Sequence, residues 1–300
     1  MTYFCAKLSQ MRRTYKVAGP RVAVVMPDSE AGWNEMGNYE PFRVDDGDDC
    51  AFVVEQVQTF PDAPEKVQVA KCCNAPKEPR FEVYEWEGYR LMDFAPTVEA
   101  PICCRVMINE DFSKFQFQIS NYWSFSFNTM MKMLFSFATA SKGTLQIHAS
   151  VTMKDGKGYL FLGKSGTGKS THSQLWINNI EGCSLLNDDN PVLRMDADGA
   201  FRVYGSPWSG KTPCYRNMDV PVGAIVKLSQ AKQNSIKKMS VSESYASIYS
   251  SFTGMKFVKH LADAYHFTNF KLVTTVPFYA LDCLPDAEAA FLCYKTVSQQ

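Results

Sequence analysis

Residues 158–170 read GYLFLGKSGTGKS and join the apolar segment Gly158–Leu162 to the glycine-rich segment Gly163–Ser170. The pattern Gly-x-x-x-x-Gly-Lys-Ser is a phosphate-binding loop, or Walker A motif. Its glycines let successive backbone N–H groups point at phosphate oxygens, and a following helix adds the partial positive charge of its N-terminus. A strand before the loop and a helix after it are the context that the motif requires, and the residues on either side predict both.

The loop predicts binding of a nucleoside triphosphate, in the first place Mg-ATP. Lys169 is expected to reach the β and γ phosphates, and the hydroxyl of Ser170 is expected to bind Mg²⁺. An ordinary glycine-rich turn between a strand and a helix is the alternative. The predicted nucleotide-binding residues are Gly163, Lys164, Ser165, Gly166, Thr167, Gly168, Lys169, Ser170 and Thr171.

An acidic pair, Asp188-Asp189, follows the apolar run 183–186 and lies 19 and 20 residues after Lys169. In phosphoryl transfer one carboxylate holds the metal, and another group takes the proton of the acceptor. A plain turn is the alternative, because residues 187–191 are rich in turn formers. His148, in the strand expected before the loop strand, is either a structural residue or the partner of one of these carboxylates.

A second loop, Gly205–Lys211, contains two glycines, a proline and Trp208. Phosphoryl transfer generally needs a further cation, so Lys211 and the nearby Arg216 are candidate catalytic residues that would neutralise the transferred phosphate. The alternative is a structural turn in which Trp208 is buried and Lys211 is solvated.

His148, the loop 163–170 and Asp188-Asp189 together resemble the catalytic domain of HPr kinase/phosphorylase, which is similar in turn to phosphoenolpyruvate carboxykinase. The resemblance covers roughly residues 143–228 and is weaker in the tail, where 276–281 and 285–289 look like the closing strand and helix. It implies a mixed-sheet α/β core unlike the doubly wound nucleotide-binding folds, and makes self-association plausible. It also implies that Asp188 binds the metal and that Asp189, assisted by His148, takes the proton of a serine hydroxyl.

The chain also departs from that family. Its N-terminal part does not look like the regulatory domain of full HPr kinases, and the loop 205–211 stands where their second glycine-arginine signature would be. The resemblance therefore indicates a divergent branch, whose phosphate acceptor is a serine of some protein or a small molecule.

The pattern of the first part predicts a β-rich domain, residues 1–123, built of antiparallel meanders with one buried face. Residues 124–142 show helical spacing of Phe, Met and Leu, and this helix is expected to pack against the second domain. The expected strands are 21–26, 52–57, 66–70, 81–86, 89–92, 103–108 and 114–119.

Residues 124–300 are expected to form the α/β nucleotide-binding domain. A helix is expected from Ser170 to Asn178, a mainly helical tail over 240–270, and a last helix from Asp286. The expected strands are 145–151, 158–162, 184–186, 191–195, 201–204, 224–228 and 276–281.

The composition of the chain limits the classes of partner that are expected. The chain has 300 residues, and its 31 Lys and Arg balance 31 Asp and Glu, so a nucleic-acid partner is not favoured, and Lys237-Lys238 is expected on a solvated helix face. The apolar stretch 125–140 is too short and too polar to span a membrane. Residues 1–13 do not have the pattern of a secretory signal, so a cytoplasmic protein is expected.

Ten cysteines without paired Cys-x-x-Cys motifs predict reduced buried thiols rather than a zinc site.

Three functions stay open. The first is a kinase that transfers the γ-phosphate of ATP to a hydroxyl. The second is a non-catalytic nucleotide-binding module, whose partner surface would lie in the β-rich part around exposed aromatics such as Trp33, Tyr122 and Trp123. The third is a carboxykinase-like lyase, ranked last because the chain has only four histidines and few arginines near the loops.

Overall fold

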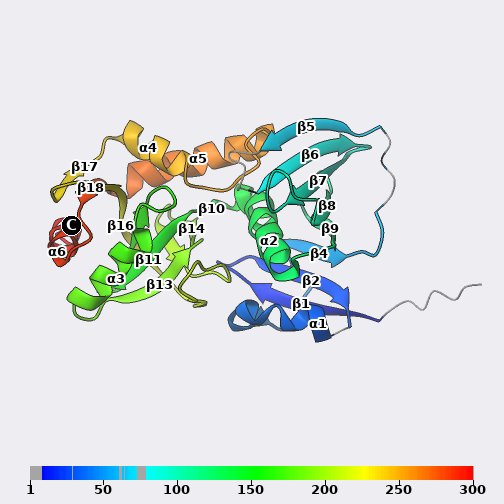
Figure 1. Cartoon of the computed structure of the whole chain (residues 1–300), viewed down its shortest axis with the longest axis horizontal. Coiled ribbons are helices and arrows are strands. Elements are labelled where there is room, and N and C mark those ends of the chain that lie inside the picture. The colour runs from blue at the N-terminus through cyan, green and yellow to red at the C-terminus, as the bar shows by residue number, and fades with distance from the viewer. Residues whose placement is uncertain (1–8, 29, 61–62, 64, 73–78, 300) are drawn as a thin grey trace, which may run out of the picture. The chain divides into compact units, whose positions relative to one another are not determined.

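The computed structural model describes residues 9–28, 30–60, 63, 65–72 and 79–299. The chain divides into two compact units, Met1–Ala138 and Thr139–Gln300. Among the described residues each unit is built on a nine-stranded sheet, and helices complete a mixed α/β fold, as expected (Figure 1). None of the described helices is both long and apolar enough to cross a membrane.

The sheet of the first unit has the order β3-β1-β2-β4-β9-β8-β7-β6-β5. Strands β5 to β9 form the antiparallel meander that their sequence alternation predicts. In the middle, however, β4 runs parallel to both β2 and β9, so the expectation of antiparallel pairing throughout is wrong. The strands are β1 (Gln10–Lys16), β2 (Arg21–Pro27), β3 (Arg43–Val44), β4 (Phe52–Gln56), β5 (Val67–Cys72), β6 (Arg80–Trp86), β7 (Tyr89–Ala95), β8 (Cys104–Ile108) and β9 (Lys114–Ile119).

Three helical segments complete this unit: α1 (Glu30–Asn34), the 3-10 helix η1 (Gly37–Phe42) and α2 (Trp123–Thr139). Helix α2 packs on the first sheet, since the ring centroid of Phe127 lies 5.8 Å from that of Phe117 and that of Phe135 lies 6.4 Å from that of Phe52. This corrects the expectation that the helix packs against the second domain. The division between the units falls at the last residue of α2, whereas the boundary expected from the sequence precedes the helix.

The aromatic residues proposed for a partner surface in this unit differ in exposure. Trp33 is 4% exposed and lies under the guanidinium of Arg13, whose Cζ is 4.4 Å from the ring centroid. Trp123 is half-buried and stacks on Phe127, while Tyr122 is exposed. Trp33 therefore belongs to the core, and its expected exposure is corrected.

The second sheet has the order β10-β14-β15-β16-β12-β11-β13, with β18 paired to β16 and β17 to β18. Its centre is parallel, because β16 runs parallel to both β12 and β18, and its edges are antiparallel. The strands are β10 (Thr144–Gln146), β11 (Ala149–Lys154), β12 (Lys157–Leu162), β13 (Ser184–Asp189), β14 (Val192–Met195), β15 (Phe201–Tyr204), β16 (Asp219–Gln230), β17 (Ser235–Lys238) and β18 (Phe278–Cys283).

Two details of this sheet differ from the sequence expectation. The strand expected over 145–151 is broken at Ile147 and His148, whose backbone N–H groups donate to Pro191 O (3.1 Å) and Ser251 O (2.8 Å). The pair Lys237-Lys238 is exposed but lies in β17, so its expected helical setting is wrong. The break leaves His148 outside the regular pairing of β10 and β11.

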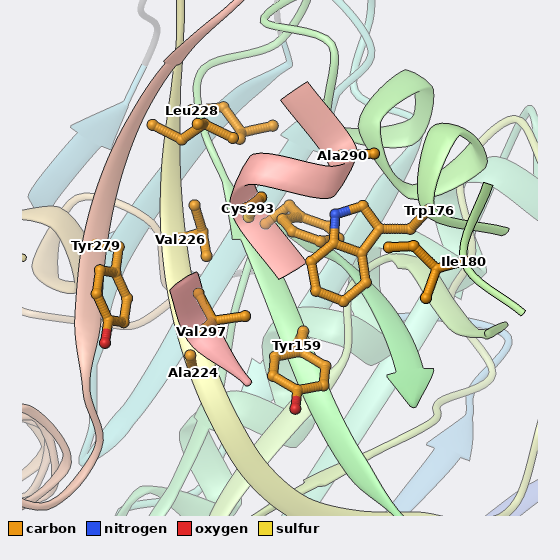
Figure 2. Close-up of a cluster of buried hydrophobic side chains, with 12 residues drawn as sticks. Tyr159, Trp176, Ile180, Ala224, Val226, Leu228, Tyr279, Ala290, Cys293 and Val297 are labelled. Atoms are coloured by element: carbon orange, nitrogen blue, oxygen red, sulfur yellow. The ribbon is translucent and has the colours of Figure 1, made fainter. Parts of the chain in front are cut away.

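The helices of the second unit are η2 (Ala140–Lys142), α3 (Lys169–Asn179), α4 (Val241–Tyr249), α5 (Lys259–Thr275) and α6 (Ala287–Val297). Helices α3 and α6 pack on the sheet around Trp176, which is fully buried (Figure 2). Its ring centroid lies 5.1 Å from that of Tyr159 and 5.3 Å from that of Phe161, both on β12. This packing ties α3 to the strand that precedes it and so holds the loop between them.

The eight cysteines in the described residues are all free thiols. Cys103, Cys104 and Cys293 are buried, as expected for structural thiols, and burial raises the pKa of Cys104. Cys72 is exposed and the other four are half-buried, so the expectation of buried thiols holds only in part. The remaining two cysteines, Cys5 and Cys73, lie outside the described residues, as does most of the segment 1–13 that was considered as a signal.

Candidate functional site

The glycine-rich loop connects β12 to α3 as the motif requires. Gly166 and Gly168 have φ values of 81° and 104°, in the left-handed region that side chains rarely adopt, and Gly168 is the N-cap of α3. Thr167 closes a turn by donating its N–H to Lys164 O at 3.1 Å. A Cβ on Gly163 would lie 3.0 Å from the Thr167 side chain, so this position is also restricted.

The Lys169 side chain folds back over this loop and is 9% exposed. Its Nζ donates to Gly163 O (3.0 Å) and Lys164 O (3.4 Å) and lies 2.9 Å from His148 Nε2. Burial lowers the pKa of Lys169, while the charges of Asp189 and Asp188 act in the opposite direction. The ammonium group therefore contacts the loop carbonyls and lies close enough to Asp188 and Asp189 for their charges to act on it.

His148 links Lys169 to the acidic pair. Its Nδ1 lies 2.9 Å from Asp189 Oδ1, and its Nε2 faces Lys169. Because an ammonium group can only donate, Nε2 accepts and Nδ1–H donates to the carboxylate. The break between β10 and β11 places His148 at this point, and the other oxygen of Asp189 accepts a hydrogen bond from the Asn190 side chain. The structure thus brings three predicted site residues into one hydrogen-bonded chain.

Asp188 is 3% exposed, and its Oδ2 is buried without a hydrogen-bond partner among the described residues. A buried carboxylate oxygen without a partner is costly unless a cation or donor joins it. Magnesium is usually held by one or two carboxylates together with phosphates and waters, so it would not require more protein ligands. The described residues contain no group of three or more His, Cys, Asp and Glu side chains that could hold a metal. Asp188, with its unpartnered buried oxygen, and Ser170, which is exposed, are the residues that could hold a magnesium ion.

The second loop is held against the end of β13 by a buried polar network. Asn187 donates from Nδ2 to Ser206 Oγ (3.2 Å) and Trp208 O (3.0 Å), and Ser206 Oγ donates to Asn190 O (2.7 Å). Gly210 N–H also donates to Asp188 O at 2.5 Å. Asn187 was noted in the sequence only as a turn former, since no local pattern shows that its amide reaches residues about 20 positions away.

Lys211 and Arg216 are exposed, whereas Asp188 is buried and Asp189 is half-buried. Lys211 makes no ion pair or hydrogen bond among the described residues, and Arg216 acts electrostatically on Cys214. No contact within the described part of the chain joins either cation to the acidic pair. Lys211 nevertheless follows Gly210 directly, so its backbone is one residue from the contact with Asp188.

One further contact on the loop was not foreseen. Gln230, at the end of β16, donates from Nε2 to Gly166 O at 3.2 Å. The parallel pairing of β16 with β12 brings this residue to the loop, and pairing between strands so distant in sequence cannot be deduced from a local pattern.

Residues 119–285 match the model of one protein family, described as SynChlorMet cassette protein ScmC. The chain belongs to the ScmC family. The matched segment is more than half of the chain and contains every candidate site residue of this ScmC family member, from His148 to Arg216. The search of curated proteins found no match.

Among solved structures, the ScmC family chain is similar to the Hpr(Ser) kinase/phosphatase from Coxiella burnetii. The two share 13% sequence identity over 51% of this chain and 93% of that chain, with a TM-score of 0.31. The relationship to HPr kinases expected from the sequence therefore stays a prediction, and ScmC is the family shown for the chain.

Proposed function

We propose that the second unit of this ScmC family member binds Mg-ATP and transfers its γ-phosphate to a hydroxyl group. The hydrogen-bonded chain Lys169–His148–Asp189 carries this proposal, because it joins the lysine of a phosphate loop to a carboxylate. A lysine placed for phosphates and a base placed for the acceptor are the two protein groups that phosphoryl transfer needs most.

In this proposal the loop backbone binds the phosphates, and Lys169 exchanges its contact with His148 for the β and γ phosphates. Asp189 takes the proton of the acceptor hydroxyl, and the Nδ1–H group of His148 keeps the carboxylate oriented. Asp188 and Ser170 would hold Mg²⁺, which when bound neutralises charge on the phosphates. Lys211 would stabilise the transferred group only after the exposed side chain turned inward, and Arg216 is a weaker candidate for the same task.

The acceptor is proposed to be a serine of a protein or the hydroxyl of a small molecule. Transfer of label from γ-labelled Mg-ATP into a cell extract would identify the acceptor fraction, with Asp189→Asn as the test variant. Loss of a positioned base lowers the transfer rate by about 10²–10⁴-fold, while the unchanged loop should leave ATP affinity nearly the same. Lys169→Ala is the matched control, since it should lose ATP binding itself.

A second candidate is a nucleotide-binding module that does not transfer phosphate. The exposure of Lys211 and Arg216 favours it, because neither of these two cations contacts the acidic pair in the described part of the chain. If the wild type and Asp189→Asn both bind ATP and neither labels any species, this candidate replaces the kinase. Equal labelling by both proteins would instead remove Asp189 from the role of base.

A further inference from the structure

A pocket of about 430 Å³ lies at the tip of the phosphate loop, within the second unit. One wall is the loop backbone at 166–168, another is the start of α3 with Thr171 and His172, and the rest comes from the ends of β16 and β18. Its volume falls within the range of about 300–1,000 Å³ that is usual for small-molecule sites. Neither Lys169 nor the acidic pair lines it, so it shares the loop with the site described above but does not include the Lys169–His148–Asp189 chain.

The lining of this pocket is mixed, with polar and apolar surface in similar amounts. Its apolar side chains are Leu175 from α3, Leu228 from β16, Ala231 and the segment Leu284–Pro285 after β18. Leu284 is 38% exposed, so part of its side chain is available to a ligand. This lining offers apolar side chains to the faces of a ring and polar groups to its edges, and it contains no Lys or Arg for a second phosphate group.

His172 adds a buried polar group with no partner. The residue is 3% exposed, and its Nε2 accepts a hydrogen bond from Trp176 Nε1 at 3.1 Å. Nδ1 therefore carries the proton of the neutral ring, yet it has no hydrogen-bond partner in the described structure. Burial lowers the pKa of His172 to about 4, so the ring is neutral at pH 7. An unpaired buried donor is costly, and a ligand acceptor in the adjoining pocket would relieve that cost.

We infer that this pocket binds the nucleoside half of the nucleotide whose phosphates lie in the loop, with the base against Leu175, Leu228 and Leu284. The inference rests on the proposed nucleotide binding of the loop and deepens it. The reacting phosphate then lies at the Lys169–His148–Asp189 end, and the base lies at the loop tip. Gln230, which donates a hydrogen bond to Gly166 O, and Thr171 also line the pocket and can hydrogen-bond ribose hydroxyls.

Titration calorimetry with two ligands, Mg-ATP and Mg-tripolyphosphate, tests the inference on the full chain. Ala231→Trp fills the pocket, and Lys232→Trp adds the same ring at the adjacent exposed position as a control. We expect Ala231→Trp to weaken ATP binding at least about tenfold and to leave tripolyphosphate within about twofold, since only ATP reaches the pocket. Leu284→Asp, on the partly exposed wall, should act in the same direction without filling the core.

The results of these titrations distinguish nucleotide binding by the loop from nucleoside binding by the pocket. If Ala231→Trp and Leu284→Asp bind ATP as tightly as the wild type and the Lys232→Trp control, the pocket does not hold the nucleoside, although the loop can still bind phosphates. Equal weakening of ATP and tripolyphosphate would also overturn the pocket, since the change would then act on the loop. If the wild type binds neither ligand, the proposed function fails, and this inference fails with it.

Discussion

His148 holds the ammonium group of Lys169 on one ring nitrogen and the carboxylate of Asp189 on the other. In the absence of nucleotide this arrangement engages the ammonium group that the phosphates would otherwise meet. A nucleotide must therefore compete with His148 and with two loop carbonyls for the same Nζ. His148 thus affects both the resting position of Lys169 and the orientation of Asp189.

We predict that His148→Ala lowers the rate of phosphoryl transfer by about 10–100-fold, because a hydrogen bond to a charged group contributes about 1.5–3 kcal/mol. ATP affinity should not fall, since Lys169 loses a competitor. Initial rates with γ-labelled ATP and a binding titration measure the two effects separately. His260→Ala, at an exposed histidine of α5, is the control, and an equal loss of rate in both variants would contradict the role of His148.

His172 predicts a pH dependence of stability. Its pKa is lowered from 6.5 to about 4 by burial, so between these values the unfolded chain binds a proton that the folded chain does not. The free energy of unfolding therefore decreases as the pH falls from about 6.5 to 4, by about 3 kcal/mol for this group alone. Urea unfolding of wild type and His172→Phe at pH 7 and 4.5 should show a weaker pH dependence in the variant. The same dependence in both proteins would argue against a buried neutral imidazole.

At the scale of elements, alternation and helical spacing located most strands and helices, because each such pattern reflects which face is buried. The polar strand β1 and the exposed strand β17 were missed, since their sequences, QMRRTYK and SIKK, contain few apolar residues. The parallel pairing of β4 was missed because the order of strands in a sheet depends on connections that no local pattern records.

The features of the candidate site likewise differ in whether the sequence could predict their positions. The loop and the acidic pair could be placed from sequence because each follows its own strand directly. The contact of His148 with Lys169 and the position of Lys211 depend on a strand break and on the Asn187 network, which arise only in the folded chain. Their catalytic roles stay predictions.

The second loop provides a prediction at this scale. Asn187→Ala removes the donors to Ser206 and Trp208 and the acceptor for Asn190 N–H, and it should lower the free energy of unfolding by about 1–3 kcal/mol. Amide exchange in 205–211 should also become faster. Denaturant unfolding and hydrogen exchange measure the two effects, with the exposed Asn178→Ala expected within about 0.5 kcal/mol of wild type. Unchanged exchange in 205–211 would show that other contacts hold the loop.

At the scale of the whole molecule, each unit has its own sheet and its own buried side chains. The first is rich in aromatic rings between its sheet and α2, and the second centres on Trp176 between β12, α3 and α6. The candidate site lies entirely in the second unit, and the family match begins only at residue 119. The proposed nucleotide binding therefore assigns no function to the first unit.

This division predicts two transitions in thermal unfolding by calorimetry, because units with separate cores need not unfold together. A non-hydrolysable ATP analogue at about 100 times its Kd should stabilise one transition by about 2.7 kcal/mol and leave the other unchanged. Trp176→Ala, which removes a buried ring from the second core, should lower the same transition that the analogue raises. A single transition shifted by both changes would contradict independent units.

The break between β10 and β11 has a consequence for how this chain can diversify. The backbone N–H groups of Ile147 and His148 are satisfied by the carbonyls of Pro191 and Ser251, so the break does not depend on the imidazole. We therefore expect other side chains at position 148 to leave the fold intact, although this position lies between Lys169 and Asp189. Exchange of this one side chain would alter the chemistry next to Lys169 and leave the scaffold intact, which makes it a natural starting point for evolving or engineering new activities on this fold.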